Sequence, residues 1–213
     1  ERLAAVQSSD IEQLHETNPL RDGLSESNPQ RFRVERPKSS FASWYQFFPR
    51  SEGAYYGEDG KIVPGNLKTS IAGLERAAAE GFNIVYLPPI FPIGVTNRKG
   101  RNNSLVAGPN DPGSPFGIGS ELGGHDTVDP QLGTMDDFKA FCERAHELGL
   151  EIALDFALQC SPDHPWVKAH PNWFRTKPDG TIAFAENPPK KYQDIYPIDF
   201  NADMEGIEKE VER

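Results

Sequence analysis

A dense group of chemically capable side chains lies in residues 151–165 (EIALDFALQCSPDHP). Asp155 lies inside an apolar run, where an unpaired carboxylate would be costly, so we expect it to have a partner or a task. Polar and titratable side chains follow at once: Gln159, Cys160, Ser161, Asp163 and His164. A buried strand that leads directly into such a loop is typical of a ligand site in an α/β protein.

Two further stretches place cations beside amide or hydroxyl groups. In residues 98–103 (RKGRNN), Lys99 is close to Asn102 and Asn103, and Gly100 permits a close backbone approach. Residues 186–197 (ENPPKKYQDIYP) contain Asn187, Lys190, Lys191, Tyr192 and Asp194. Such groups suit an anionic ligand rich in hydroxyls. Each stretch could equally be a solvated basic loop, and that is our interpretation for Lys191.

Two tempting kinds of site are set aside. Residues 123–129 (GGHDTVD) contain His125, Asp126 and Asp129, and Asp163 precedes His164, but neither group has the ligand spacing of a metal site. Cys160 could be a nucleophile, yet nothing in the sequence indicates a group that would activate its thiol. We therefore predict no metal, no cofactor and two unreactive thiols.

The elements that position these residues alternate between strand and helix. Apolar runs predict buried strands at residues 41–48, 83–87 and 151–156. Helical spacing predicts helices at 67–80, closed by Gly81, and at 134–148, with Thr134 as N-cap and Gly149 as the stop. Long polar loops follow the second and third strands, whereas the helix-to-strand returns are short.

This asymmetry favours an α/β fold, the N-terminal part of a (β/α)8 TIM barrel with its first three strands and a long insertion after strand 3. A doubly wound open sheet is the alternative, although no GxGxxG or Walker loop follows any strand. The predicted domains are the end of a preceding domain or a linker (1–35), the first barrel part (36–158), an inserted loop subdomain (159–200) and the start of the next helix (201–213).

Composition narrows the classes of partner. The chain has 213 residues, a formal net charge of -10 and only two cysteines. The negative charge argues against nucleic acid, and the absence of a long apolar run argues against a membrane. The cysteine usage indicates a reducing cytoplasm. Because the chain begins with Glu1 and stops at Arg213 inside a helical pattern, we expect a fragment of a longer protein.

Several motifs resemble one family: YLPPIFPIG (86–94), RKGRNN (98–103), GGHDTVDPQLGT (123–134), LDFALQCSPDHPW (154–166) and ENPPKKYQDIYPI (186–198). They are similar to the α-1,4-glucan:maltose-1-phosphate maltosyltransferases, members of the α-amylase clan of glycoside hydrolases. The resemblance covers roughly residues 36–213. It implies transfer of a maltosyl unit from α-maltose 1-phosphate to the non-reducing end of an α-1,4-glucan, with release of phosphate.

The resemblance also implies roles for residues. Lys99, Gln159 and Asp194 are expected to bind the donor, with Asn187, Lys190 and Tyr192 on its phosphate side. Asn102, His125, Asp126 and Asp155 are possible pocket-lining residues, and a structural hydrogen-bonding role is equally open for His125 and Asp126. Gln159 and Cys160 stand where ordinary amylases have Asn and His, which favours a transferase over a general hydrolase.

A donor and a product that are both α-linked imply retention through two carboxylates and a glycosyl-enzyme. In the clan these carboxylates follow later strands, so we assign no catalytic residue here and expect the nucleophile and general acid beyond Arg213. The chain alone is then expected to be inactive and unstable, because an open half-barrel leaves a strand edge unpaired. The resemblance suggests a homodimer. Alternatives are an α-glucan or trehalose hydrolase or isomerase of the same clan, or a noncatalytic glucan-binding relative.

Overall fold

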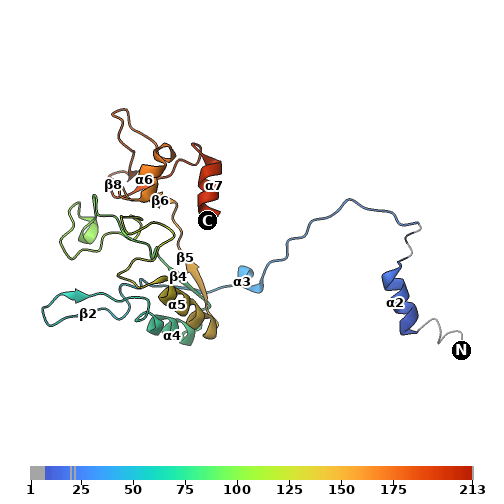
Figure 1. Cartoon of the computed structure of the whole chain (residues 1–213). Coiled ribbons are helices and arrows are strands. Elements are labelled where there is room, and N and C mark those ends of the chain that lie inside the picture. The colour runs from blue at the N-terminus through green and yellow to red at the C-terminus, as the bar shows by residue number, and fades with distance from the viewer. Residues whose placement is uncertain (1–7, 20, 22, 213) are drawn as a thin grey trace. The chain divides into compact units, whose positions relative to one another are not determined.

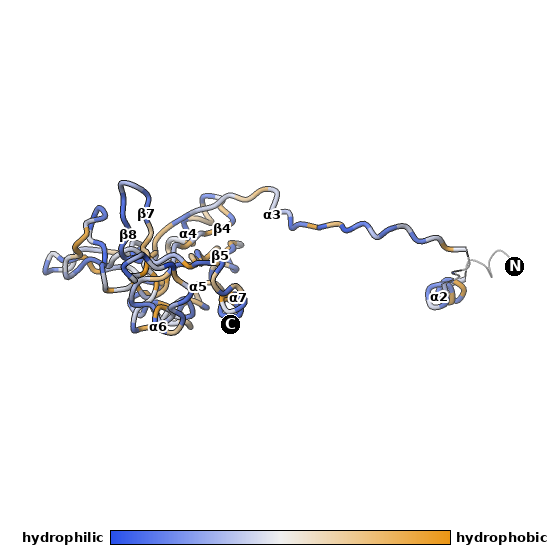
Figure 2. Tube along the Cα trace, turned by 90° about the horizontal axis from the view of Figure 1, so that it is seen from above, coloured by the Kyte–Doolittle hydropathy of each residue, from blue (hydrophilic) through white to orange (hydrophobic). Residues whose placement is uncertain are grey.

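A computed structural model describes residues 8–19, 21 and 23–212, and the chain divides into two units, Glu1–Ser40 and Phe41–Arg213. The first unit contains the helices α2 (Ser9–Thr17) and α3 (Pro37–Ser40), and none of its described residues is buried. The segment between these helices alternates in hydropathy (Figure 2), as Phe32 and Val34 alternate with charged residues. Residues 1–7, 20, 22 and 213 lie outside the described residues. They belong to the predicted preceding domain or linker (1–35) and to the predicted start of the next helix (201–213).

Three parallel strands in the order β1-β4-β5 form the centre of the second unit (Figure 1). They are β1 (Trp44–Gln46), β4 (Ile84–Leu87) and β5 (Glu151–Leu154). The helices α4 (Ile71–Ala79) and α5 (Met135–Glu147) connect them. A core of buried apolar residues lies among these elements: Leu74, Ala77, Val85, Leu87, Phe141 and Ala145. The strand-helix-strand order and the parallel sheet are as predicted.

Both helices begin and end where local chemistry requires. The Thr134 side chain accepts a hydrogen bond from the Asp137 amide, and the Asp137 carboxylate accepts one from the Thr134 amide, at 3.1 and 2.9 Å. This capping box satisfies amides that the first helical turn of α5 leaves unpaired. Gly149, at φ 76°, follows α5, and Gly81, at φ 85°, follows α4, in the left-handed conformation that glycine adopts most readily. The predicted N-cap and stop residues are confirmed.

The prediction of three buried strands is correct only for β4. Of the predicted strand 41–48, only residues 44–46 are paired, and Trp44 and Gln46 are exposed. β5 ends at Leu154, so Asp155 and Phe156 lie beyond the strand, and its residues are half-buried. The physical reason is that β1 and β5 each pair with β4 alone among the described strands, so each has one side uncovered.

Long excursions leave the carboxyl ends of β4 and β5. The first contains a short 3-10 turn, η1 (Arg101–Asn103). The second contains short elements: β6 (Gln159–Cys160), α6 (Pro165–Ala169), η2 (Pro171–Trp173), β7 (Ala185–Asn187), β8 (Lys190–Tyr192), β9 (Tyr196–Pro197) and α7 (Met204–Glu212). A separate hairpin, β2 (Tyr55–Tyr56) with β3 (Ile62–Val63), precedes α4.

A second apolar cluster holds the excursion after β5 together. It consists of Cys160, Trp166, Trp173, Phe174, Ile198 and Ile207. The indole nitrogens donate to carboxylates at the C-terminal end of the chain, Trp173 to Asp203 and Trp166 to Glu210, both at 3.0 Å. The excursion therefore has its own core. No helix among the described residues is long and apolar enough to cross a membrane.

Candidate functional site

We term Lys99, Gln159, Gln193 and Asp194, which lie around residues 116–117, the Lys99 cluster. All except Gln193 are predicted ligand-binding residues. Lys99 is 5% exposed, and its ammonium donates to the Lys191 carbonyl and to Gln193 Oε1, both at 3.0 Å. The Gln159 amide donates to the Phe116 carbonyl at 3.0 Å. A Cβ placed on Gly117 would lie 3.6 Å from Asp194 Oδ2. The cluster thus joins loops that follow two different strands.

Asp194 is the most unusual member of the Lys99 cluster. It is 4% exposed, and its Oδ1 atom is buried without a hydrogen-bond partner. Burial raises the pKa of Asp194, while its own backbone N–H and the charge of Lys99 act in the opposite direction. A buried, unpaired carboxylate oxygen is costly, so the lack of a partner for this atom distinguishes Asp194 from a residue that serves only the fold.

The residues predicted near the phosphate, Asn187, Lys190 and Tyr192, lie on the β7–β8 hairpin. Asn187 ends β7 and Lys190 begins β8, and the two form a cross-strand pair. Both side chains are exposed and Tyr192 is half-buried. Asn102 is also exposed, at φ 56° within η1. Lys191 is exposed, as expected, although its carbonyl holds Lys99.

His125 is part of a chain of hydrogen bonds that we term the histidine relay. The Trp166 amide lies 3.0 Å from His164 Nδ1, His164 Nε2 lies 3.1 Å from His125 Nδ1, and His125 Nε2 lies 2.8 Å from the Ala157 carbonyl. An amide can only donate and a carbonyl can only accept, so both tautomers are fixed and both rings are neutral. Burial lowers the pKa of His125, and burial with the neighbouring His125 lowers that of His164 to about 3.

The histidine relay forms one wall of a cavity of about 620 Å³. The cavity is lined by residues 123–127, 164–166 and 169–170 together with Phe156, Glu210 and Val211. His125 stacks on Trp166 with ring centroids 4.7 Å apart, so it presents a ring and no free nitrogen. His125 and Asp126 line this cavity, and both ring nitrogens of His125 are engaged in hydrogen bonds.

Two glycines enclose the ring of His164. A Cβ on Gly119, at φ 101°, would lie 2.1 Å from His164 Cδ2, and one on Gly124 would lie 2.4 Å from Nε2. The absence of side chains at these two positions is what allows the imidazole to be 1% exposed.

Asp155 has the partner that its place in the sequence requires. Its carboxylate accepts a short hydrogen bond from the Tyr86 hydroxyl, and this bond raises the pKa of Tyr86 to about 12. The Asp155 amide donates to the Leu87 carbonyl at 2.9 Å, which continues the pairing of β5 with β4. Asp155 thus organises the end of the sheet.

Other charged groups fix the loops that surround the site. Asp163 accepts bonds from the amides of Val95 and Thr96 at 2.6 and 2.7 Å. Burial alone would raise its pKa, but these bonds and that of the Thr96 hydroxyl outweigh burial and leave the pKa lowered. Asp163 therefore anchors the loop that leads to Lys99.

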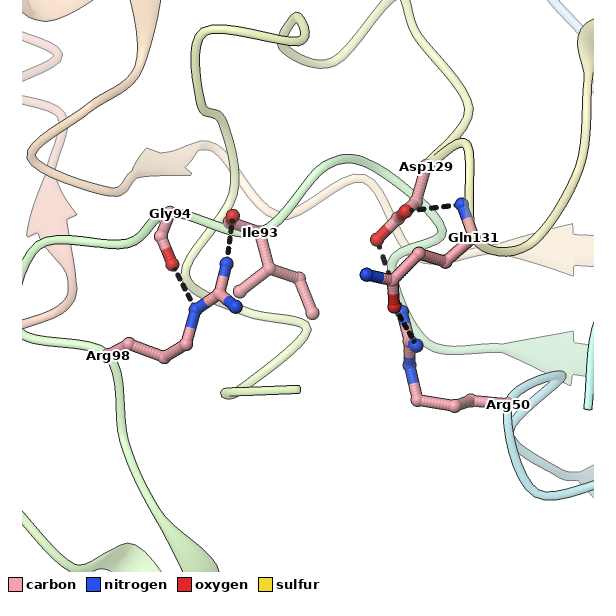
Figure 3. A network of polar contacts seen from close by, with 6 residues as sticks. All are labelled: Arg50, Ile93, Gly94, Arg98, Asp129 and Gln131. Carbon is pink, nitrogen blue, oxygen red and sulfur yellow. Dashed lines mark hydrogen bonds and ion pairs between the residues drawn. The ribbon is translucent and has the colours of Figure 1, made fainter. Parts of the chain in front are cut away.

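Two arginines stabilise the same loops (Figure 3). Arg98 donates to the carbonyls of Ile93 and Gly94, at 2.9 and 2.7 Å. Arg50 pairs with Asp129 at 3.2 Å and donates to Gln131 at 2.7 Å. Arg50 and Asp129 border a second cavity of about 240 Å³ at the ends of β1 and β4. Asp129, considered above as a metal ligand, is thus an ion-pair partner.

Cys160 is fully buried, and burial raises the pKa of its thiol, so the thiolate needed for attack is disfavoured. Among the described residues, no group of three or more His, Cys, Asp or Glu side chains is placed to hold a metal ion.

Sequence reasoning missed Gln193, Tyr86 and the true place of His164. Gln193 had a detectable signal, because it lies between Tyr192 and Asp194 in a stretch already selected. Tyr86 could have been found as a polar group on the strand beside Asp155. His164 had no local signal for its pairing with His125, which lies 39 residues away.

No protein-family model matches the chain. The chain is 84% identical over its whole length to the α-1,4-glucan:maltose-1-phosphate maltosyltransferase of Bifidobacterium longum, of which it spans 29%. It is 54% identical to the protein of the same name from Mycolicibacterium smegmatis, of which it spans 30%. The chain is closely related to these maltosyltransferases along its whole length. It corresponds to less than a third of each maltosyltransferase relative.

Solved structures agree on the fold. An α-amylase from Lactobacillus plantarum is 33% identical, with a TM-score of 0.55 over 75% of this chain and 32% of that one. A maltogenic α-amylase from Thermotoga neapolitana is 30% identical, with a TM-score of 0.54 over 74% of this chain and 32% of that one. The chain therefore shares its α/β architecture with part of these two α-amylases.

Proposed function

We propose that this chain is a segment of a glycosyltransferase that moves a maltosyl unit from α-maltose 1-phosphate to the non-reducing end of an α-1,4-glucan and releases phosphate. The observation that carries the proposal is the match along the entire chain to relatives that bear this name. The segment would form the first three strands of a (β/α)8 barrel, a proposal that the parallel β1-β4-β5 sheet supports. The enzyme would act in the cytoplasm, in α-glucan synthesis, as a homodimer.

Within this proposal the Lys99 cluster binds the donor. Asp194 offers a buried acceptor and Lys99 a buried cation, which suit a sugar hydroxyl and a phosphate ester. Gln159 would contact the same ligand from the other side of residues 116–117. Asn187, Lys190 and Tyr192 would approach the phosphate from the β7–β8 hairpin, where the Asn187 and Lys190 side chains are exposed.

The chemistry of the proposed reaction is retaining, because the donor and product linkages are both α. The residues described above would bind and orient the donor and exclude water, and none of them is assigned as the nucleophile or general acid. Asp155 remains a positioning residue because its carboxylate is bonded to Tyr86.

The test uses the protein as its gene encodes it in full, incubated with α-maltose 1-phosphate and glycogen. Growth of glucan chains in steps of two glucose units, with stoichiometric phosphate release, is the expected result. Free maltose as the main product would instead favour a hydrolase of the same clan. Binding of glucan with neither product would favour a noncatalytic relative.

A further inference from the structure

The ammonium group of Lys99 is held by neutral acceptors alone. It has three N–H donors, of which two are used by the Lys191 carbonyl and by Gln193 Oε1, each at 3.0 Å. Among the described residues no carboxylate forms a direct ion pair with Lys99, although the charge of Lys99 acts on Asp194 and opposes the rise of its pKa. The group is therefore fixed in direction by two hydrogen bonds and retains one N–H for another partner.

Gln193 is itself fixed before any ligand arrives. Its backbone carbonyl accepts a hydrogen bond from the Asn97 side chain at 3.3 Å, and Asn97 has φ 57° in the turn that leads to Lys99. Two hydrogen bonds thus join residues 97–99 to Gln193, one from Asn97 and one from Lys99. The backbone of Gln193 is bonded to Asn97, and its side chain is bonded to Lys99. The side-chain amide oxygen therefore already faces Lys99 before a ligand binds.

The next residue along the chain is Asp194, whose buried Oδ1 atom has no partner. A carboxylate in place of the Gln193 amide would neutralise Lys99, whereas the amide does not. The chain thus separates two tasks: a neutral group orients the cation, and the carboxylate of Asp194 remains available as an acceptor.

We propose that Gln193 is a positioning residue that orients the Lys99 ammonium without neutralising it, and that it thereby sets the affinity for the anionic donor. This inference rests on the proposed function and adds a residue to it. The effect is expected for a donor that carries negative charge and not for a neutral sugar.

The test compares Gln193→Glu with wild type in the protein as encoded in full. The variant keeps the shape of the side chain and adds one negative charge at the atom 3.0 Å from Lys99 Nζ. We expect the KM for α-maltose 1-phosphate to rise about tenfold, equivalent to about 1.4 kcal/mol, with kcat within about twofold of wild type. The inhibition constant of maltose, which has no charge, should change less than about twofold.

Two further variants complete the design. Gln13→Glu makes the same charge change on an exposed residue of α2 and should leave both constants unchanged. Gln193→Met removes the acceptor without adding charge, and we expect a smaller rise in KM, because Lys99 is loosened but not neutralised.

An unchanged KM for Gln193→Glu, in an enzyme whose wild type consumes α-maltose 1-phosphate, would overturn the positioning role and leave the proposed function intact. Equal weakening of maltose and α-maltose 1-phosphate, with a lower Tm, would show a merely structural role. A wild type that does not consume α-maltose 1-phosphate would overturn the proposed function itself.

Discussion

At the scale of single residues, Asp194 stands out because its environment opposes its charge. Its Oδ1 atom is buried without a partner, and burial raises its pKa. A group that served only the fold would be bonded at both oxygens, as Asp163 is by Val95 and Thr96. We infer that Asp194 is kept for a ligand at the expense of stability.

The substitution Asp194→Asn should separate these two effects. We expect the KM for α-maltose 1-phosphate to rise more than about tenfold, because the amide is a weaker acceptor than a carboxylate. The Tm should stay the same or increase, because an uncompensated buried charge is removed. Enzyme kinetics and thermal unfolding check this, with Asp59→Asn in the exposed β2–β3 turn as control. A lower Tm with an unchanged KM would contradict it.

Tyr86 and Asp155 allow a second test at this scale. Replacement of Tyr86 by Phe removes the hydroxyl that donates to Asp155, and we expect a loss of about 1–2 kcal/mol in the free energy of unfolding. In a double-mutant cycle with Asp155→Ala the two effects should be less than additive, because each change removes the same hydrogen bond. Full additivity in denaturant unfolding would show that the two side chains do not interact.

At the scale of elements, α5 is the helix that brings the chain back to β5. Its capping box predicts that Thr134→Ala lowers the free energy of unfolding by about 1 kcal/mol. Thr134→Ser retains the hydroxyl and should be nearly neutral, which makes it the matched control. Urea denaturation of both variants provides the measurement, and an equal loss in both would mean that the methyl group of Thr134, rather than the cap, is what matters.

The histidine relay joins three segments and predicts a pH dependence. The folded pKa of His164 is lowered from 6.5 to about 3, so the stabilisation is complete above pH 6.5 and is lost progressively as the pH falls toward 3. His164→Gln should therefore show a shallower fall in unfolding free energy between pH 6.5 and pH 4 than wild type does. His15→Gln, in exposed α2, should keep the wild-type slope. If the unfolding free energy of wild type, His164→Gln and His15→Gln fell equally with pH, the proposed role of the histidine relay would be refuted.

At the scale of the whole molecule, the sheet has one covered strand and two uncovered edges. β4 lies between β1 and β5, which have no second neighbour among the described strands. If the proposed barrel is correct, the protein as encoded in full covers both edges. Hydrogen exchange should then find β1 and β5 as protected as β4, whereas an open sheet would leave the two edge strands faster by orders of magnitude.

Much of the fold was predictable because its signals are local. Periodicity located α4, α5 and the three strands, and Thr134 and Gly149 located the ends of α5. The burial of β1 and β5 was predicted wrongly, because an apolar run does not reveal whether a strand has one neighbour or two.

The candidate site was predictable only as a set of residue types. Lys99 and Asp194 were selected from their local composition, but the bond between Lys99 and Gln193 spans 94 residues and leaves no periodic trace. The histidine relay was missed for the same reason. In each case the sequence did not reveal where the long loops after β4 and β5 run, because tertiary packing decides their course.

The close approach of Gly119 and Gly124 to His164 limits which substitutions this protein can accept in evolution. Any side chain at either glycine would overlap the imidazole, so single replacements at these positions should be among the least tolerated in a saturation library. A smaller residue at position 164 would relieve the overlap at both. Tolerance at position 124 should therefore appear only in library members that have first lost the histidine, whereas position 119, at φ 101°, stays strained for any side chain even then.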